Sequence, residues 1–119
     1  MPPPIRRFTP AQFGGRSSKY NSVMVEVEGK KFHSKKEARK YTQLRTLQLI
    51  GEIGELETQV RLPLFVNGIK ITTYVCDFRY VTKAGVTVYL DVKGMETDVF
   101  KIKKKLVLAC LGIEIIVEH

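Results

Sequence analysis

The segment "VTVYLDVKG", residues 86–94, combines the pattern of a β-strand with two charged side chains at its end. Its apolar and polar residues alternate, as in a strand that is covered on one face: Val86, Val88, Leu90 and Val92 against Thr87, Tyr89, Asp91 and Lys93. The strand therefore ends by placing Asp91 and Lys93 side by side, just before Gly94. A carboxylate beside an ammonium group at a strand end indicates a site, whose other members we expect on the neighbouring elements.

Turn and capping signals define the elements on both sides of this strand. Ser34, with Glu37 three residues later, predicts a capping box that opens a helix ending at about residue 50, before Gly51. Asn67-Gly68 predicts a hairpin between strands at 56–65 and 69–81, and a turn at 83–85 leads into the strand at 86–93. A helix at about 97–111 and a strand at 113–117 complete an α/β domain with a mixed sheet, in the order α-β-β-β-α-β.

The second predicted helix has an apolar stripe that we expect to be buried. At helical spacing this stripe consists of Val99, Ile102, Leu106 and Cys110. Lys101, Lys104 and Lys105 are then expected on the outer side of the helix.

The charge of the chain is its strongest global signal. With a net charge of +8 over 119 residues, the chain is typical of proteins that bind a polyanion, and nucleic acid is the first candidate. Residues 1–20 form a basic N-terminal arm with Arg6, Arg7, Arg16 and Lys19 and no acid, ahead of a single folded domain, residues 21–119. Two interpretations of the arm remain open: a solvated tail, or a segment that binds phosphates or a second subunit.

The cysteines and the hydropathy bear on the location of the protein. Cys76 and Cys110 lie in apolar segments without CxxC spacing, which favours reduced thiols in the core and a cytoplasmic protein. No apolar run approaches the length that a bilayer requires, and the N-terminus shows no secretory pattern. We therefore expect no membrane partner.

The hairpin geometry brings a second acid toward the end of the quoted strand. Asp77 precedes the turn at 83–85 by about as much as Asp91 follows it, so the two should lie near each other on adjacent strands. Along its strand we expect Asp77 to share a face with mostly apolar side chains: Ile69, Ile71, Thr73 and Val75. Two acids in such a place repel unless they hold a cation, and oxygen ligands without His or Cys favour Mg²⁺, with Mn²⁺ as a substitute.

Glu37 and Lys93 each have two interpretations at this stage. Glu37 shares a helical stripe with Tyr41, Leu44 and Gln48, so it either completes the acidic site or serves only the capping box. Lys93 is either a salt-bridge partner of the aspartates or a cation that holds an attacking water and offsets charge on a phosphate.

The order of Glu37, Asp77 and then Asp91-Val92-Lys93 resembles the PD-(D/E)XK nuclease superfamily, and the resemblance covers about residues 30–119. It implies a restriction-endonuclease-like core in the same element order. The sequence departs from the motif in "CDFRY", residues 76–80, where Cys76 stands at a position that is often proline. Several stretches also look like a family of small phage and prophage proteins without an assigned function: "FHSKKEARKY" (32–41), "LETQVRLPL" (56–64), "YVCDFRY" (74–80) and "LDVKGMETDVFKIKKKL" (90–106).

The arrangement of acids is further similar to phage endonuclease I, a resolvase of Holliday junctions. The resemblance implies that Asp77 and Asp91 bind the metal together with the backbone carbonyl of Val92, and that Lys93 orients or activates the water. It implies that Glu37 completes the site, through a second metal or through a water. Gln59 matches a polar position at the start of the first core strand, where it either touches the site or serves strand entry.

The leading hypothesis is accordingly a Mg²⁺-dependent DNA endonuclease, phage-encoded, acting in the host cytoplasm as a homodimer on Holliday junctions or other branched DNA. Basic residues on the arm and the two helices are expected to bind the DNA backbone: Arg6, Arg7, Arg16, Lys19, Lys35, Lys36, Lys101, Lys104 and Lys105. Two alternatives remain, a non-catalytic basic nucleic-acid-binding protein and a nuclease subunit of a larger complex. The convergence of Asp77, Asp91 and Lys93 separates a nuclease from a non-catalytic binder, because a mere binder has no reason to place acids against phosphate.

Overall fold

The structure of the chain, a computed structural model, describes residues 24–119. The predicted arm, residues 1–20, lies outside the described residues, as do its four candidate DNA contacts: Arg6, Arg7, Arg16 and Lys19.

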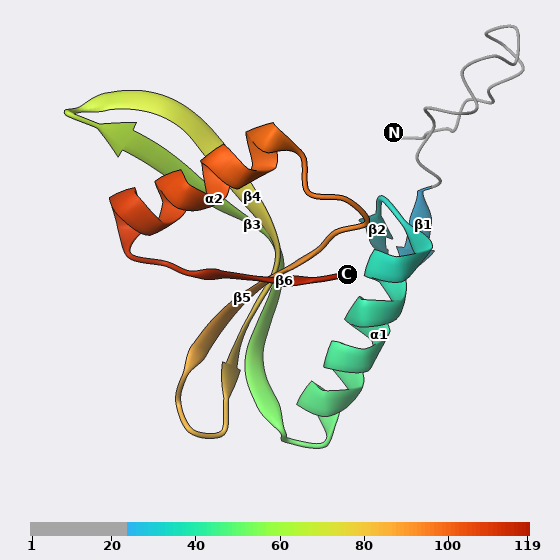
Figure 1. Cartoon of the computed structure of the whole chain (residues 1–119). Coiled ribbons are helices and arrows are strands. Elements are labelled where there is room, and N and C mark those ends of the chain that lie inside the picture. The colour runs from blue at the N-terminus through green and yellow to red at the C-terminus, as the bar shows by residue number, and fades with distance from the viewer. Residues whose placement is uncertain (1–23) are drawn as a thin grey trace, which may run out of the picture.

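The described chain folds into two helices and a four-stranded mixed sheet, preceded by a small hairpin (Figure 1). The elements are β1 (Val25–Val27), β2 (Lys30–Phe32), α1 (Lys35–Leu49), β3 (Ile53–Val66), β4 (Ile69–Thr82), β5 (Thr87–Val92), α2 (Asp98–Leu111) and β6 (Ile115–Glu118). The sheet order is β3-β4-β5-β6, with β6 parallel to β5 and the other neighbours antiparallel. The predicted fold class and the order α-β-β-β-α-β are thus confirmed.

Helix α1 begins and ends where the capping signals predict. The hydroxyl of Ser34 accepts a hydrogen bond from the Glu37 N–H at 3.0 Å, as in a capping box. After the C-cap Ile50, Gly51 takes φ +84°, a left-handed conformation that glycine adopts without strain. The predicted stripe faces the sheet, with Glu37, Tyr41 and Leu44 buried.

The long β3–β4 hairpin packs against a different helix in each of its halves. The proximal half (53–58 and 78–82) joins the α1 core, which contains Phe32, Ala38, Tyr41, Leu44, Phe78 and Leu90. The distal half (60–66 and 69–76) joins the α2 core, which contains Leu64, Tyr74, Cys76, Phe100, Val107 and Ile115. Figure 1 shows α1 and α2 beside opposite ends of this hairpin.

The helix that covers β4 changes between two residues that strand alternation would assign to the same face. Cys76 and Phe78 are two positions apart, so an untwisted strand would point both to the same face. Instead Cys76 packs in the α2 core and Phe78 in the α1 core, because the strongly twisted sheet exchanges its covered face at Asp77. We call this place the seam: Gln59 on β3, Asp77 on β4 and Asp91 on β5.

The expected surroundings of Asp77 are wrong for this reason. The apolar residues predicted to share its face include Ile69, Ile71 and Val75, and all three are exposed. The core residues of the distal half of β4 are the intervening ones, Tyr74 and Cys76. Alternation assigns two faces correctly but does not say which face a helix covers.

The predicted buried stripe of α2 is right in its second half, where Leu106 and Cys110 pack against the α2 core, and wrong in its first half. Val99 and Ile102 are 62% and 60% exposed, whereas Phe100 and Val107 lie in the core. Apolar side chains occur around most of the circumference of α2, so helical periodicity could not select the buried face. Neither described helix is long and apolar enough to cross a membrane.

Both cysteines are free thiols. Cys76 is fully buried, and this burial raises the pKa of its thiol to about 12. Cys76 is therefore an unreactive core residue, as predicted, whereas Cys110 is only half-buried at the edge of the α2 core.

Candidate active site

At the seam, carboxylate oxygens and not backbone carbonyls accept the hydrogen bonds between β4 and β5. The two strands pair regularly from Val81 and Thr87 up to Phe78 and Leu90. One step further, the Asp77 N–H donates to Oδ1 of Asp91 at 2.7 Å, and the Val92 N–H donates to Oδ2 of Asp77 at 2.9 Å. The two aspartates are thus adjacent, as the hairpin geometry predicted, and each binds the backbone of the opposite strand.

Asp91 is the deeper of the two acids. It is 1% exposed, and the hydroxyl of Tyr74 donates a hydrogen bond to its Oδ2. Both carboxylate oxygens of Asp91 therefore have protein donors. Sequence reasoning missed Tyr74, because no local pattern links it to an acid 17 positions further along the chain.

Glu37 reaches the seam from the first turn of α1. It is 4% exposed, with Oε1 accepting from the His33 N–H at 3.0 Å and Oε2 from Nε2 of Gln59 at 2.9 Å. Glu37 thus caps the helix and contacts the sheet at the same time. Gln59 takes φ +53°, a left-handed conformation that is strained for a residue with a side chain, and this conformation accompanies its contact with Glu37.

The acids perturb one another electrostatically. The pKa of Asp77 is raised to about 6, chiefly by burial and in addition by the charge of Glu37 and a hydrogen bond with it. The Val92 N–H and the Lys93 charge act in the opposite direction. Burial also raises the pKa of Asp91, against the effect of the Asp77 N–H and of Lys93. Glu37 and Asp77 therefore interact electrostatically across the seam.

Lys93 lies just beyond the end of β5, on the α2 side of the seam. Its Nζ is 4.5 Å from the centroid of the Phe100 ring, and its N–H donates to the Glu118 carbonyl at 2.9 Å. The Lys93 charge lowers the pKa of both aspartates. The structure therefore brings the four predicted catalytic residues together: Glu37, Asp77, Asp91 and Lys93.

Comparison with known proteins gives a family but no activity. The model of one family, described as "Protein of unknown function (DUF1064)", matches residues 17–109. The chain belongs to the DUF1064 family. No curated protein and no solved structure matches it. All four residues of the site lie within the matched part of this DUF1064 chain.

The donor set fits a hard divalent cation. The carboxylates of Asp77 and Glu37 offer oxygen ligands, and because the pKa of Asp77 is raised, a metal bound there would compete with a proton on Asp77. Within residues 24–119, no three His, Cys, Asp or Glu side chains form a ready-made cluster for a metal. Mg²⁺ commonly takes one or two carboxylates and keeps several waters. Asp77 and Glu37 are the direct candidates, whereas Asp91 would have to exchange one of its two hydrogen bonds.

The candidate DNA contacts on the two helices are available to an anion. Lys35 and Lys36 directly precede Glu37 at the start of α1. On α2, Lys101 and Lys105 are exposed and Lys104 is half-buried, so its predicted outer position is only partly right. In the described part of the chain, none of these five lysines forms an ion pair.

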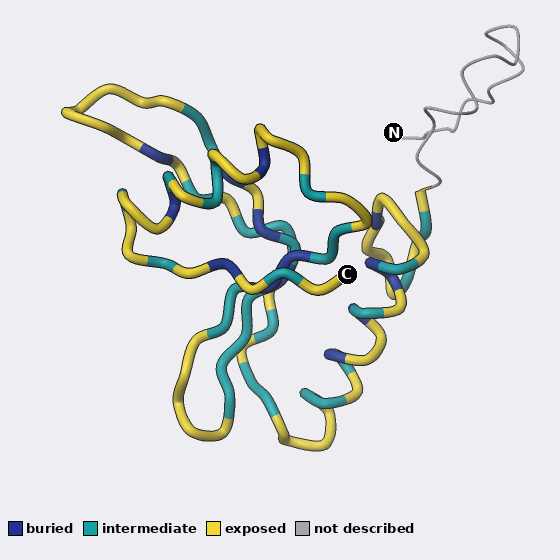
Figure 2. Tube along the Cα trace, in the orientation of Figure 1, coloured by how far each residue is buried: buried dark blue, intermediate teal, exposed yellow. Residues whose placement is uncertain are grey.

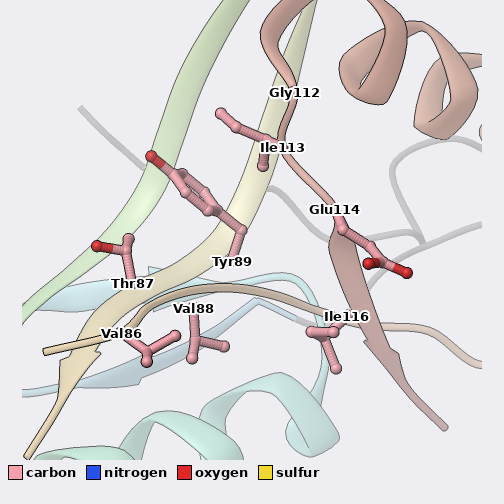
Figure 3. Close-up of a pocket in the computed structure, with 8 residues that line it drawn as sticks. All are labelled: Val86, Thr87, Val88, Tyr89, Gly112, Ile113, Glu114 and Ile116. Carbon is pink, nitrogen blue, oxygen red and sulfur yellow. The ribbon is translucent and has the colours of Figure 1, made fainter. Parts of the chain in front are cut away.

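A hollow of about 330 Å³ lies elsewhere, at the edge where β6 diverges from the start of β5 (Figure 3). Its lining is Val86, Thr87, Val88, Tyr89, Gly112, Ile113, Glu114 and Ile116. None of the candidate catalytic residues borders it. The one carboxylate in its lining, Glu114, is exposed.

Proposed function

We propose that this protein is a Mg²⁺-dependent endonuclease of the PD-(D/E)XK type that hydrolyses phosphodiester bonds in branched DNA. The observation that carries the proposal is the meeting of three acids and a lysine at the seam, where backbone pairing between β4 and β5 is interrupted. Burying acids close together costs stability, and acids with perturbed pKa values are frequent at functional sites. The DUF1064 match neither adds to nor opposes this proposal.

The chain's own residues have distinct roles in the proposed reaction. A bound Mg²⁺ would supply Lewis-acid stabilisation of phosphate charge and would acidify a water. Asp77 and Glu37 would hold this ion, with the Val92 carbonyl as the third ligand. Asp91 would hold the Asp77 backbone in place by accepting the 2.7 Å hydrogen bond from the Asp77 N–H. Lys93 would orient the attacking water and offset the charge that develops on the phosphate oxygens.

A branched DNA substrate and a homodimer are the finer parts of the proposal. One chain carries one site, and symmetric cutting of a four-way junction requires two, which a two-fold pair supplies. Lysines that hold backbone phosphates without reading bases suit a substrate that is recognised by its shape. We place this activity in the cytoplasm, in that of the host if the chain is phage-encoded.

The alternative of a non-catalytic binder is favoured by the charge of +8 alone. A non-catalytic binder does not account for the buried acids at the seam, because acids repel the phosphates that such a protein would bind. A nuclease subunit of a larger complex would keep the site and would require its partner for cutting.

The decisive experiment incubates the full chain with labelled four-way junction, fork, linear duplex and single-stranded DNA, in Mg²⁺ and in EDTA. We expect cutting in Mg²⁺, strongest on the four-way junction, and none in EDTA. Equal cutting of all four substrates would leave a nuclease without preference for branches. Binding without any cutting, in either Mg²⁺ or Mn²⁺, would favour the non-catalytic reading.

Two variants assign the cutting to the seam. Asp77→Asn and Lys93→Ala should each lower the rate by about 100- to 1,000-fold or more, because the first removes a proposed metal ligand and the second removes the cation that offsets phosphate charge. Glu114→Gln and Lys83→Ala are the matched controls, since both side chains are exposed and lie outside the seam. Wild-type rates in Asp77→Asn or Lys93→Ala would exclude this site.

A further inference from the structure

The backbone of Gln59 has a conformation that the path of the chain does not require. Within residues 24–119, the residues other than glycine with a positive φ are Glu28, Glu55, Gln59 and Asn67. Glu28 and Asn67 lie in hairpin turns, and Glu55 lies in a β-bulge, where the register of β3 against β4 shifts. A turn or a bulge accounts for a left-handed residue, so these three have a local explanation.

Gln59 lies in neither a turn nor a bulge. The residues before and after it pair with Phe78 and Cys76 without a change of register, so Gln59 lies opposite Asp77. A left-handed conformation is strained for a residue with a β-carbon and persists only where the surrounding contacts hold it. The strain at Gln59 therefore points to its side-chain contact.

The side chain of Gln59 connects β3 to the first turn of α1. Its Nε2 donates to Oε2 of Glu37 at 2.9 Å, while Oε1 of Glu37 accepts from the His33 N–H at 3.0 Å. In Figure 2 the start of α1 and the crossing of the strands contain buried positions, whereas the ends of the hairpins are exposed. Because each oxygen of Glu37 has a donor, the direction of this buried carboxylate is fixed.

A neutral amide suits a carboxylate that binds a metal. Such carboxylates are commonly held in turn by hydrogen bonds from neighbouring groups, which set their direction. A lysine or arginine would also hold Glu37, but its charge would compete with the metal for the carboxylate. In the described part of the chain Glu37 forms no ion pair, so its charge is available to a metal.

A purely structural role for Gln59 has a different consequence. A buried acid costs stability unless it is hydrogen-bonded, so the amide would then serve only to satisfy Glu37. Its removal would lower the stability of the fold and leave the metal affinity of the folded protein unchanged. The strained backbone adds a second cost, which favours a role that depends on the direction of the bond.

We propose that Gln59 is a positioning residue, which holds the Glu37 carboxylate toward Asp77 so that both acids bind one metal ion. The inference rests on the proposed function, because the metal belongs to the proposed reaction. Gln59 contacts neither the metal nor the DNA and acts through Glu37.

Calorimetric titration of the full chain with Mn²⁺, together with thermal melting in EDTA, tests this role. Gln59→Leu should weaken Mn²⁺ binding by about 10- to 100-fold, because the Glu37 carboxylate loses its direction. Gln43→Leu makes the same change at an exposed glutamine of α1 and should bind like the wild type. In protein that already carries Glu37→Gln, adding Gln59→Leu should change the affinity by less than about 2-fold, because both residues act through one carboxylate.

Gln59→Asn is the second variant if Gln59→Leu does not fold. Asparagine adopts the left-handed conformation more readily than glutamine, but its side chain is one methylene shorter. Gln59→Asn should therefore fold and bind Mn²⁺ at least about 10-fold more weakly than the wild type.

The other outcomes overturn the positioning role. A lower melting temperature of Gln59→Leu with wild-type Mn²⁺ affinity would make Gln59 a structural residue. A further loss of about 10-fold or more in the Glu37→Gln protein would mean that Gln59 acts on the metal directly.

DNA cleavage by the same proteins separates this role from the proposed function. A wild type that binds Mn²⁺ and cuts DNA, beside a Gln59→Leu protein that binds equally, ends only the positioning role. A wild type that cuts no DNA, although Gln59→Leu weakens its Mn²⁺ binding as expected, ends only the nuclease. A wild type that does not bind Mn²⁺ ends both.

Discussion

The two halves of the β3–β4 hairpin differ from the seam that joins them. Each half is an ordinary two-layer unit, in which one face of the strands packs on a helix and the backbone pairs with its neighbours. At the seam, carboxylates take the place of backbone partners, and acids occupy a buried position. The comparison indicates that the two cores provide stability, whereas the burial of acids at the seam costs it.

The largest effect should come from the cores. Phe78→Ala, in the proximal half, should lower the free energy of unfolding by about 3–5 kcal/mol, and Leu64→Ala, in the distal half, by about 2–5 kcal/mol. Urea unfolding measures both, with Val75→Ala as an exposed control on β4. A single transition would show that the halves fold together across the seam, whereas two transitions would show independent units.

Glu37→Gln should lower DNA cleavage by about 100-fold, or about 3 kcal/mol in the barrier, while leaving stability nearly unchanged. The glutamine oxygen can still accept from the His33 N–H, and a rotated Gln59 amide can bond to the new amide group. Cleavage rates and thermal melting of the same protein separate the two roles. If Glu37→Gln cleaves like the wild type at ordinary Mg²⁺, Glu37 is only a helix cap.

The seam should make the metal-free protein less stable as the pH rises. The pKa of Asp77 is raised to about 6 in the folded state, mainly by burial, from about 3.9 in the unfolded chain. Its protonated form therefore contributes stability that is complete below about pH 4 and is lost as the pH rises through about 6.

Asp77→Asn should abolish this loss of stability at high pH, which amounts to at most about 3 kcal/mol in the free energy of unfolding. Urea unfolding in EDTA at pH 4.5 and pH 7.5 gives the free energy of unfolding of the variant and of the wild type, and their difference is compared between the two pH values. The variant should gain relative stability at the higher pH. A difference that is independent of pH would mean that Asp77 does not titrate in this range.

The smallest effect concerns the arm. Deleting residues 1–19 removes the charges of Arg6, Arg7, Arg16 and Lys19, so log affinity for DNA should depend less steeply on log salt, by up to about 0.9 per lost phosphate contact. Binding titrations at several salt concentrations give this slope. An unchanged slope would assign the arm to a protein partner instead.

Local signals predicted the elements of the fold, because each depends on few neighbouring residues. Ser34 with Glu37 gave the start of α1, and Asn67-Gly68 gave the hairpin that brings Asp77 beside Asp91. The exchange of faces between Cys76 and Phe78 could not be predicted in this way, because sheet twist accumulates over whole strands and depends on what the helices cover.

Only the site residues whose positions follow from strand register or helical periodicity could be predicted. Asp77 and Asp91 follow from counting along a hairpin, and Glu37 from a helical stripe. Tyr74 and the left-handed conformation of Gln59 are tertiary features, since both depend on acids that lie far away in sequence.

Calorimetric titration of the full chain with Mn²⁺ tests most directly whether the seam is a metal site. The wild type should bind Mn²⁺, and Asp77→Asn should bind it at least about 10-fold more weakly, because a direct ligand is lost. Glu114→Gln, which changes an exposed acid outside the seam, should bind like the wild type. Absence of binding to the wild type, or equal binding to Asp77→Asn, would contradict a metal-dependent site at the seam.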